Sequence, residues 1–549
     1  MASSDDTTTV TGKSPDPPSK PLLFPYIDEF HHHHSPPPSE SDPSSSSHYP
    51  TTITYNYSPR PIKDLTFLLL FLLFVISTFA FGIFASINRN PNPPSSVSAF
   101  SYDIRTDSCV KTGNRVSFFN FFLSDSGYIL KNLILTVVVT LILSIPISLF
   151  VVFSLKHYAK QLVYASLPFV VLVPVCLDVY WFVACTVNDT CSERFALGYR
   201  ILVLVFVLLV VGVMVWIIVV NWSRVELTVK IIRVSADALS NNLGLFGVLP
   251  VMSLGLVIYF APIVLFLVFA RLNGEFVPRG KRGKVFCEWE QDGWVPAYYA
   301  LAILTMLWSA AAMVEAQVYV ISGTIAQWYF SKDDSRVKRS IRSSLRNAFG
   351  PSSGTICFSG LLIAIVRMVR GAVDTAANED ARGMVNVVLR CCVNALLSAF
   401  EFLNKFTINF AAITGEAYCA SARFAYELLR RNLLSAVVVE IVSTRLLAAI
   451  VFVISAVYAI VVCVILKAAT DLGVDSYFVA AVSFVVVLVI LGFLVHVLDN
   501  VIDTVYICYA IDRDKGEVCK ADVHEIYVHL PISRNHNPAY LNARTPLLV

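Results

Sequence analysis

Charged side chains are scarce in this chain of 549 residues. Asp, Glu, Lys and Arg together make up 15% of it, and hydrophobic residues make up 56%. A soluble protein of this length needs more charge on its surface, so the composition excludes that class and indicates a polytopic membrane protein with the lipid bilayer as its surroundings. The formal net charge is only +3, and we expect no nucleic-acid partner.

Motifs of catalysis are also missing. We find no nucleophile–base constellation, phosphate-binding loop or metal-ligand spacing, and Gly244-x-x-Gly247 alone is too weak to indicate a nucleotide site. The twelve cysteines are scattered, and the adjacent Cys391 and Cys392 lack a second pair or histidines nearby. We therefore expect no enzymatic activity, no cofactor and no metal.

Residues 1–61 are rich in Pro, Ser, Thr and Asp and lack a periodic apolar pattern. Such a segment cannot bury enough apolar surface to offset its ordering entropy, so we expect a disordered cytosolic tail that could recruit protein partners. The run His31–His34 within it is typical of a low-complexity tract. The first apolar run begins near residue 65 and is long enough to be a membrane anchor rather than a signal peptide.

The remaining apolar runs predict an all-α fold, a polytopic helical membrane domain over residues 62–510 with a cytosolic tail over 511–549. About ten transmembrane helices are expected, near residues 65–87, 128–155, 162–187, 197–220, 244–270, 294–330, 353–369, 396–422, 446–467 and 477–501. Six positive charges between Lys332 and Arg346, and two in the turn Lys156–Lys160, place these loops in the cytosol. An even number of spans then places both termini in the cytosol.

Two segments do not fit this topology easily. The loop Arg271–Gly293 carries five basic residues, yet parity places it outside, against the positive-inside rule. The crossing near 396–422 would be polar and so would be buried within the bundle. Alternatively, the segment 353–369 re-enters the membrane and the following residues lie on its surface.

The apolar stretch Trp294–Phe330 contains an ionisable residue, Glu315. Trp308, Glu315 and Tyr319 are spaced by 7 and 4 residues and share one helix face. Aromatic faces with a carboxylate between them suit an organic cation, so we predict a substrate site here. Alternatively, Glu315 is protonated or paired for structural reasons. Because it lies toward the cytosolic half of the span, it could also belong to an inner gate.

Two further groups extend this prediction. Asp178, Tyr180 and Trp181 are candidates for a second wall of the substrate site. His496, Asp499 and Asp503 share a face near a membrane interface and could relay protons, although Asp499 and Asp503 could instead pair with basic loops.

The loop after the third span has two candidate modifications. Asn188 begins an Asn-x-Thr sequon, and Cys185 and Cys191 could form a disulfide if the loop is outside the cytosol. The sequon is weak evidence, because Asn188 lies very near the predicted membrane surface.

From about residue 240 to 515 the chain resembles the choline transporter-like family. The resemblance rests on four blocks in the family's order: Trp308 with the ending Gly323–Phe330, then Phe349–Arg370, Ala412–Asn432 and Val501–Asp512. The loop between the first two spans has only about 40 residues, which is more similar to the plant and fungal branch than to the animal one.

The resemblance implies a secondary transporter of choline or a related organic amine, working by alternating access and coupled to protons. It also implies a multi-pass protein of the plasma membrane, with an endomembrane such as the trans-Golgi as the alternative. A trafficking or lipid-handling scaffold without a solute pathway is the alternative function, in which the N-terminal tail and the basic loop would recruit partners and anionic lipid.

Overall fold

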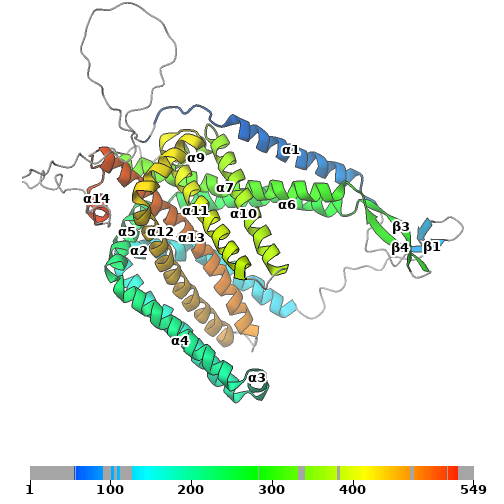
Figure 1. The fold of residues 1–549 in the computed structure, drawn as a ribbon, viewed down its shortest axis with the longest axis horizontal. Helices are drawn as coiled ribbons and strands as arrows, with labels where there is room; N and C mark the ends of the chain where they lie inside the picture. The colour runs from blue at the N-terminus through cyan, green and yellow to red at the C-terminus, as the bar shows by residue number, and fades with distance from the viewer. Residues whose placement is uncertain are drawn as a thin grey trace, which may run out of the picture.

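The protein is almost entirely helical in a computed structural model (Figure 1), which describes residues 55, 57–90, 100–103, 108–111, 127–281, 284–331, 340–379, 384–469, 475–515 and 517–529. The predicted N-terminal tail lies almost wholly outside these residues, as does most of the basic loop 332–346. The helices are α1 (Leu65–Ile87), α2 (Gly127–Val187), α3 (Asp189–Arg194), α4 (Leu197–Val220), α5 (Trp222–Ser240), α6 (Leu245–Ala270), α7 (Val295–Phe330), α9 (Ser340–Ala348), α10 (Ser353–Glu379), α11 (Met384–Thr414), α12 (Tyr418–Ala469), α13 (Asp475–Lys515) and α14 (Ala521–Tyr527).

Eight helices in the described part of the chain are long and apolar enough to cross a membrane. One of them, α2, has 61 residues, about 90 Å at 1.5 Å per residue, which is far more than the roughly 30 Å of one hydrocarbon core. It contains both predicted spans 128–155 and 162–187. The helix is interrupted within the predicted turn Lys156–Lys160, by non-helical dihedrals at Tyr158 (φ −123°, ψ 25°). Helix α2 therefore consists of two helical segments joined at this kink, one over each predicted span.

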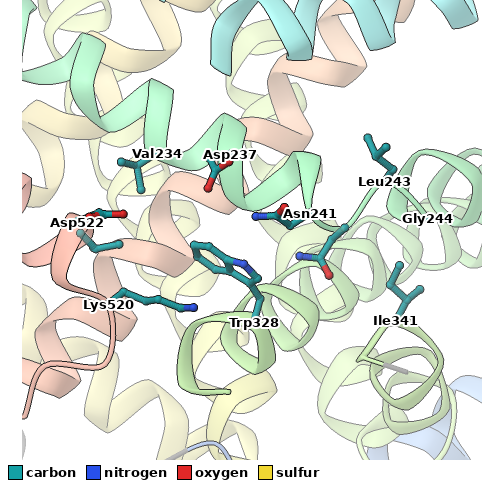
Figure 2. A pocket seen from close by; sticks show the side chains of 11 residues that line it. Val234, Asp237, Asn241, Leu243, Gly244, Trp328, Ile341, Lys520 and Asp522 are labelled. Atoms are coloured by element: carbon teal, nitrogen blue, oxygen red, sulfur yellow. The ribbon is translucent and has the colours of Figure 1, made fainter. Parts of the chain in front are cut away.

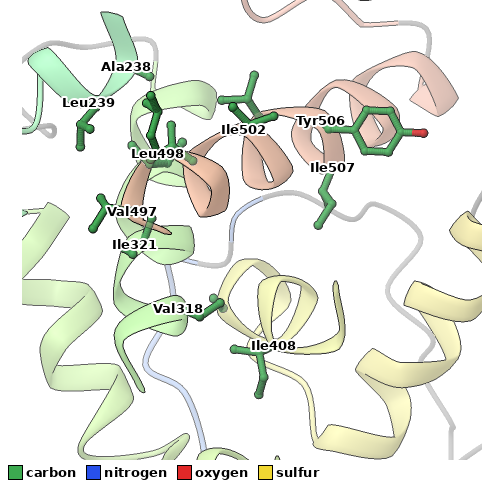
Figure 3. Close-up of a cluster of buried hydrophobic side chains, with 14 of the residues drawn as sticks. Ala238, Leu239, Val318, Ile321, Ile408, Val497, Leu498, Ile502, Tyr506 and Ile507 are labelled. Atoms are coloured by element: carbon green, nitrogen blue, oxygen red, sulfur yellow. The ribbon is translucent and has the colours of Figure 1, made fainter. Parts of the chain in front are cut away.

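The long helix α7 is the centre of the bundle, because it packs against α1, α6, α10, α11 and α13. Its Val318 and Ile321 are buried in one core with Ile408 of α11 and with Val497 of α13 (Figure 3). Small residues bring α7 and α10 close together, since a Cβ added to Gly360 would lie 2.6 Å from the Cα of Ala312. The stretch that the sequence singled out therefore organises the packing of the whole domain.

The predicted span 396–422 is wrong as a single helix. Helix α11 begins earlier, at Met384, and ends at Thr414, and α12 begins at Tyr418. Gly415 separates them with φ +76°, a left-handed conformation that favours glycine and stops the helix. Hydropathy missed this break because polar and apolar residues alternate on both sides of it.

Two antiparallel hairpins lie at one end of the bundle, called the hairpin end below. They pair β1 (Phe100–Asp103) with β2 (Ser108–Lys111) and β3 (Gly274–Lys281) with β4 (Lys284–Gln291). A disulfide joins Cys109 to Cys287 and so ties the two hairpins together. Arg279 forms ion pairs with Glu288 and Glu290, so acids on the neighbouring strand offset part of the basic charge in this loop.

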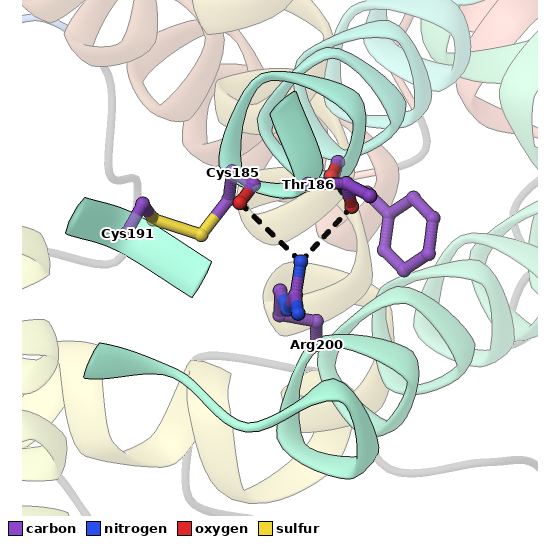
Figure 4. The surroundings of a disulfide bond; sticks show 5 residues. Cys185, Thr186, Cys191 and Arg200 are labelled. Carbon is purple, nitrogen blue, oxygen red and sulfur yellow. Dashed lines mark hydrogen bonds between the residues drawn. A yellow bond between two sulfur atoms is a disulfide. The ribbon is translucent and has the colours of Figure 1, made fainter. Parts of the chain in front are cut away.

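Cys185 and Cys191 form a second disulfide, between the end of α2 and α3. Arg200 of α4 donates hydrogen bonds from Nη1 to the carbonyl oxygen of Cys185 (3.3 Å) and to Oγ1 of Thr186 (3.1 Å) (Figure 4). These contacts fix the link between α2 and α4. Asn188 lies directly beside this disulfide, and its glycosylation stays a prediction.

Candidate functional site

The predicted face of α7, which carries Trp308, Glu315 and Tyr319, is present in the structure and faces α10. Trp308 donates its indole N–H to the carbonyl oxygen of Cys357 at 2.9 Å. Tyr319 lies four residues beyond Glu315, with its hydroxyl 2.8 Å from Oγ of Ser352. The spacing of 7 and 4 residues therefore placed three side chains on one helix interface, as the sequence indicated.

Glu315 is 7% exposed and lies among polar groups from three other helices. Its carboxyl group lies near Ser359 on α10 and Asn404 on α11, but its Oε2 atom and Nδ2 of Asn404 have no hydrogen-bond partner among the described residues. The Oδ1 atom of Asn404 accepts hydrogen bonds from Ser359 (2.9 Å) and from the hydroxyl of Tyr418 on α12 (2.7 Å). We call Glu315, Ser359, Asn404 and Tyr418 the Glu315 cluster. It offers one carboxyl group and an aromatic ring in the middle of the bundle, which suits an organic cation.

Trp308 is not open to a ligand in this conformation. The side chain is 1% exposed, and the rings of Phe71 and Phe74 pack edge-on against it at 5.2 and 5.5 Å. Both phenylalanines belong to α1. The indole can therefore face a substrate only if α1 moves away from α7.

The structure does not bring the second predicted wall to this site. Asp178, Tyr180 and Trp181 lie near the end of α2, a helix that packs against α4, α5, α12 and α13. Tyr180 is 72% exposed, and the ring contact of Trp181 is with Phe195 at 6.0 Å. Asp178 is buried, and its Oδ2 atom has no hydrogen-bond partner among the described residues. Periodicity showed that these residues share a helix segment and could not show which neighbour the helix has.

Lys405 is a functional candidate that the sequence reasoning passed over. It is on α11, and its ammonium group is 2.5 Å from Oδ2 of Asp503 on α13. Lys405 also interacts electrostatically with Glu315, and with His496 and Asp499. The signal that could have found it was a lysine inside a segment predicted to cross the membrane.

His496, Asp499 and Asp503 share a face of α13, as their spacing predicted. Asp499 accepts a hydrogen bond from Oγ1 of Thr444 on α12 at 2.7 Å, and His496 lies 3.4 Å from the amide of Asn500. The predicted alternative, in which the acids pair with basic cytosolic loops, is wrong for Asp503, since its partner is Lys405 within the bundle. The three side chains and Glu315 are thus linked through one lysine.

The end of the bundle opposite the hairpins is closed by the segment before α1, and we call it the Arg60 end. Arg60 donates hydrogen bonds from Nη1 to the hydroxyl of Tyr319 (2.5 Å) and from Nη2 to the carbonyl oxygen of Ala412 (3.0 Å). Its guanidinium also lies 5.3 Å from the ring of Tyr55. Burial raises the pKa of Tyr55 to about 12, so the ring stays neutral beside the arginine.

Asp64 holds the same segment in place. Its Oδ2 accepts hydrogen bonds from Thr355 of α10 (2.7 Å) and from the backbone N–H of Tyr418 (2.9 Å). Two glycines make room for the segment: a Cβ on Gly354 would lie 2.4 Å from the backbone of Asp64, and one on Gly415 would lie 3.0 Å from Arg60. Residues 60–64 therefore pack closely against the surrounding helices and close the Arg60 end of the bundle next to Tyr319.

Residues 205–514 match the family model described as plasma-membrane choline transporter, which is more than half of the chain. The chain belongs to this family. It is a multi-pass integral membrane protein of the choline transporter-like type, which confirms the predicted family and fold class.

Among its relatives is a CTL-like protein of Dictyostelium discoideum, 23% identical over 240 residues, with 41% of this chain and 43% of that protein covered. Choline transporter-like protein 2 of Xenopus laevis is 33% identical over 150 residues, covering 26% and 21%. Protein PNS1 of Gibberella zeae is 27% identical over 144 residues, covering 25% and 27%. The chain thus spans less than half the length of each of these relatives. The narrower prediction of a plant or fungal branch stays a prediction.

The part that matches the choline transporter-like family contains the Glu315 cluster, Lys405 and the face of His496, Asp499 and Asp503. Asp178, Tyr180 and Trp181 precede it, as does Arg60. The match therefore coincides with the polar centre of the bundle.

One group of side chains in the described part of the chain has the spacing of metal ligands. Asp512, Glu517 and Cys519 each place a ligand atom within 4.8 Å of the others. However, Oδ2 of Asp512 already accepts hydrogen bonds from Tyr329 (3.0 Å) and from the backbone N–H of Cys519 (2.9 Å). This carboxylate therefore serves to hold the C-terminal segment against α7.

Proposed function

We propose that this chain is a secondary transporter that moves choline or a related organic amine across the membrane by alternating access. One observation carries the proposal: Glu315 is buried in the central helix beside Ser359 and Asn404, and it forms no ion pair within the described residues. A carboxyl group in such a position is costly unless a cation or a proton compensates it. An organic ammonium group would supply that compensation, and the ring of Tyr418 would add a π face.

Arg60 would be the inner gate of this transporter. In the present conformation it closes the Arg60 end by binding Tyr319, the next residue on the Glu315 face, and the main chain at 412–413. Opening this end requires that these hydrogen bonds break together, because they hold one side chain against two helices. Opening the other side requires α1 to move Phe71 and Phe74 off Trp308. The two rearrangements would expose the Glu315 cluster in turn.

Lys405 supplies a means of proton coupling. Protonation of Asp503 would remove its attraction for Lys405 and free the ammonium group to approach Glu315. Lys405 and the substrate cation would then compete for one carboxylate, so a proton bound on α13 would drive the substrate off. Asp499, with His496 one turn away, would pass the proton toward Asp503.

The hairpin end would face the exterior and the Arg60 end the cytosol. Both disulfides, Cys109–Cys287 and Cys185–Cys191, would then lie in an oxidising compartment, and the basic residues of the Lys332–Arg346 segment would lie in the cytosol. The family description supports the plasma membrane as its location.

The test is uptake of labelled choline by proteoliposomes that contain the purified chain, compared with empty vesicles. We expect uptake above the empty vesicles, and a higher initial rate when a pH gradient is imposed in one direction than in the other. Uptake equal to that of empty vesicles under every gradient would contradict the proposal and favour the scaffold without a solute pathway.

A further inference from the structure

A cavity of about 750 Å³ opens between α5, α7, α9 and α14 at the Arg60 end, away from the Glu315 cluster. It is within the usual size of small-ligand sites. Figure 2 shows the indole of Trp328 in its centre, with Lys520 and Asp522 on one side and Asn241 and Ile341 on the other. The transport mechanism proposed above makes no use of this cavity.

The lining has the chemistry of a cation site. Trp328, the aromatic residue with the strongest attraction for cations, presents its ring to the cavity. Asp237 and Asp522 supply negative charge, and the amide of Asn241 supplies hydrogen-bonding groups. Asp237 is paired with Lys156 at 2.8 Å, whereas Asp522 forms no ion pair within the described residues.

The chain already places a cation of its own on this ring. The ammonium group of Lys520 lies 5.1 Å from the centre of Trp328, within the range of a cation–π contact. The fold holds Lys520 against Trp328, because the residue next to each of them binds the same carboxylate. Tyr329 and the backbone N–H of Cys519 both donate hydrogen bonds to Oδ2 of Asp512. Val523 and Tyr527 of α14 are buried and seat the segment against the bundle.

We propose that this cavity is a second ammonium-binding site, and that Lys520 occupies its aromatic face until an organic ammonium group displaces it. Two sources share that chemistry, a free amine such as choline and the choline headgroup of a lipid. This site is separate from the Glu315 cluster, and ligand binding to it does not require that the chain transports a solute. Displacement of Lys520 would weaken the attachment of the C-terminal segment to the end of α7. Binding in the cavity would therefore change the contacts at that end of the helix.

The test is photolabelling of the full chain in nanodiscs with a soluble diazirine-bearing trimethylammonium probe, followed by mass spectrometry of the labelled peptides. The nanodiscs contain phosphatidylglycerol only. We expect label on the peptides that carry Trp328, Ile341 and residues 520–523. If Lys520 covers the Trp328 ring in about two-thirds of the molecules, only about one-third can bind the probe. Lys520→Gln would free the ring in all of them and should raise this labelling about threefold. Trp328→Leu should reduce it to background.

Glu315→Gln is the matched control, because it alters the proposed transport site and should leave labelling of this cavity unchanged. Nanodiscs of phosphatidylcholine identify the source: reduced labelling there assigns the site to a lipid headgroup, and unchanged labelling assigns it to a free amine. Melting temperatures show whether each variant is folded. Labelling that Lys520→Gln fails to raise, or that a folded Trp328→Leu variant retains, would overturn the proposal.

Discussion

The ammonium group of Lys405 on α11 lies 2.5 Å from the carboxylate of Asp503 on α13, and the two side chains are 19% and 5% exposed. Breaking such a pair leaves a charge without compensation in a weakly polar interior. The same lysine interacts with Glu315 on α7. It therefore connects the proposed substrate site with the face proposed to carry protons.

Lys405→Gln should lower the free energy of unfolding by about 3–5 kcal/mol, the usual cost of removing one partner of a buried ion pair. The double variant Lys405→Gln/Asp503→Asn should recover part of that loss, because neither charge is then left alone. Thermal unfolding of the four proteins in detergent gives the coupling between the two sites. Lys160→Gln is the control, since its pair with Glu226 spans 3.9 Å and is exposed, and about 0–1 kcal/mol is expected. An equal loss in the free energy of unfolding for Lys405→Gln and Lys160→Gln would show that the buried pair stabilises the protein no more than the exposed one.

Arg60→Ala should open the Arg60 end. Ser352→Cys places a reporter thiol beside Tyr319. This thiol should react with a charged thiol reagent at least about tenfold faster in the Arg60→Ala protein. A tenfold increase corresponds to a loss of about 1.4 kcal/mol in the free energy that favours the closed state. Lys63→Ala, which removes a half-exposed pair with Glu416, should change the rate less than twofold. An unchanged rate in Arg60→Ala would mean that this arginine is not the closure.

Gly360→Ala should destabilise the domain by about 1–3 kcal/mol, because its new Cβ would meet the backbone of Ala312 at 2.6 Å and force α7 and α10 apart. Gly371→Ala on the same helix is the matched control, with nothing within 4 Å of the added atom. Its higher helix propensity should stabilise by about 0.5–1 kcal/mol. Melting temperatures that fall in the first variant and hold or rise in the second are expected. The same change in both would show that the close approach is unimportant.

Hydropathy and spacing predicted the helices and the shared face of Trp308, Glu315 and Tyr319, because both depend on residues near one another in sequence. They could not predict which helices meet. The closure by Arg60 joins residues 259 positions apart, and nothing in the pattern around residue 60 shows Tyr319 as its partner. For the same reason, Asp178, Tyr180 and Trp181 were assigned to a site from which the path of α2 separates them.

The sequence analysis also missed the backbone break between α11 and α12. Gly415 ends α11 inside a stretch that was predicted as one span. Gly415 is a single glycine without a neighbouring proline, which makes it a weak sign of an interruption. Arg60 packs so close to Gly415 that a side chain at position 415 would crowd it, and that contact is visible only in three dimensions.

The disulfide between Cys109 and Cys287 makes a prediction about topology. A protease added outside intact cells that cuts between the two hairpins should yield fragments that stay together without reducing agent and separate with it. Cys287→Ser should let the fragments separate under both conditions. Fragments of wild-type protein that separate without reduction would exclude this pairing in the cell.

The central claim is that Glu315 is the counter-charge for the transported cation. The most direct measurement is the initial rate of labelled choline uptake by proteoliposomes with Glu315→Gln, compared with Glu226→Gln, the same change at an exposed carboxylate. We predict that Glu315→Gln lowers the rate at least about tenfold, a loss of about 1.4 kcal/mol, while the Glu226→Gln rate stays within twofold of the unaltered protein. Wild-type uptake by a Glu315→Gln variant would contradict the account.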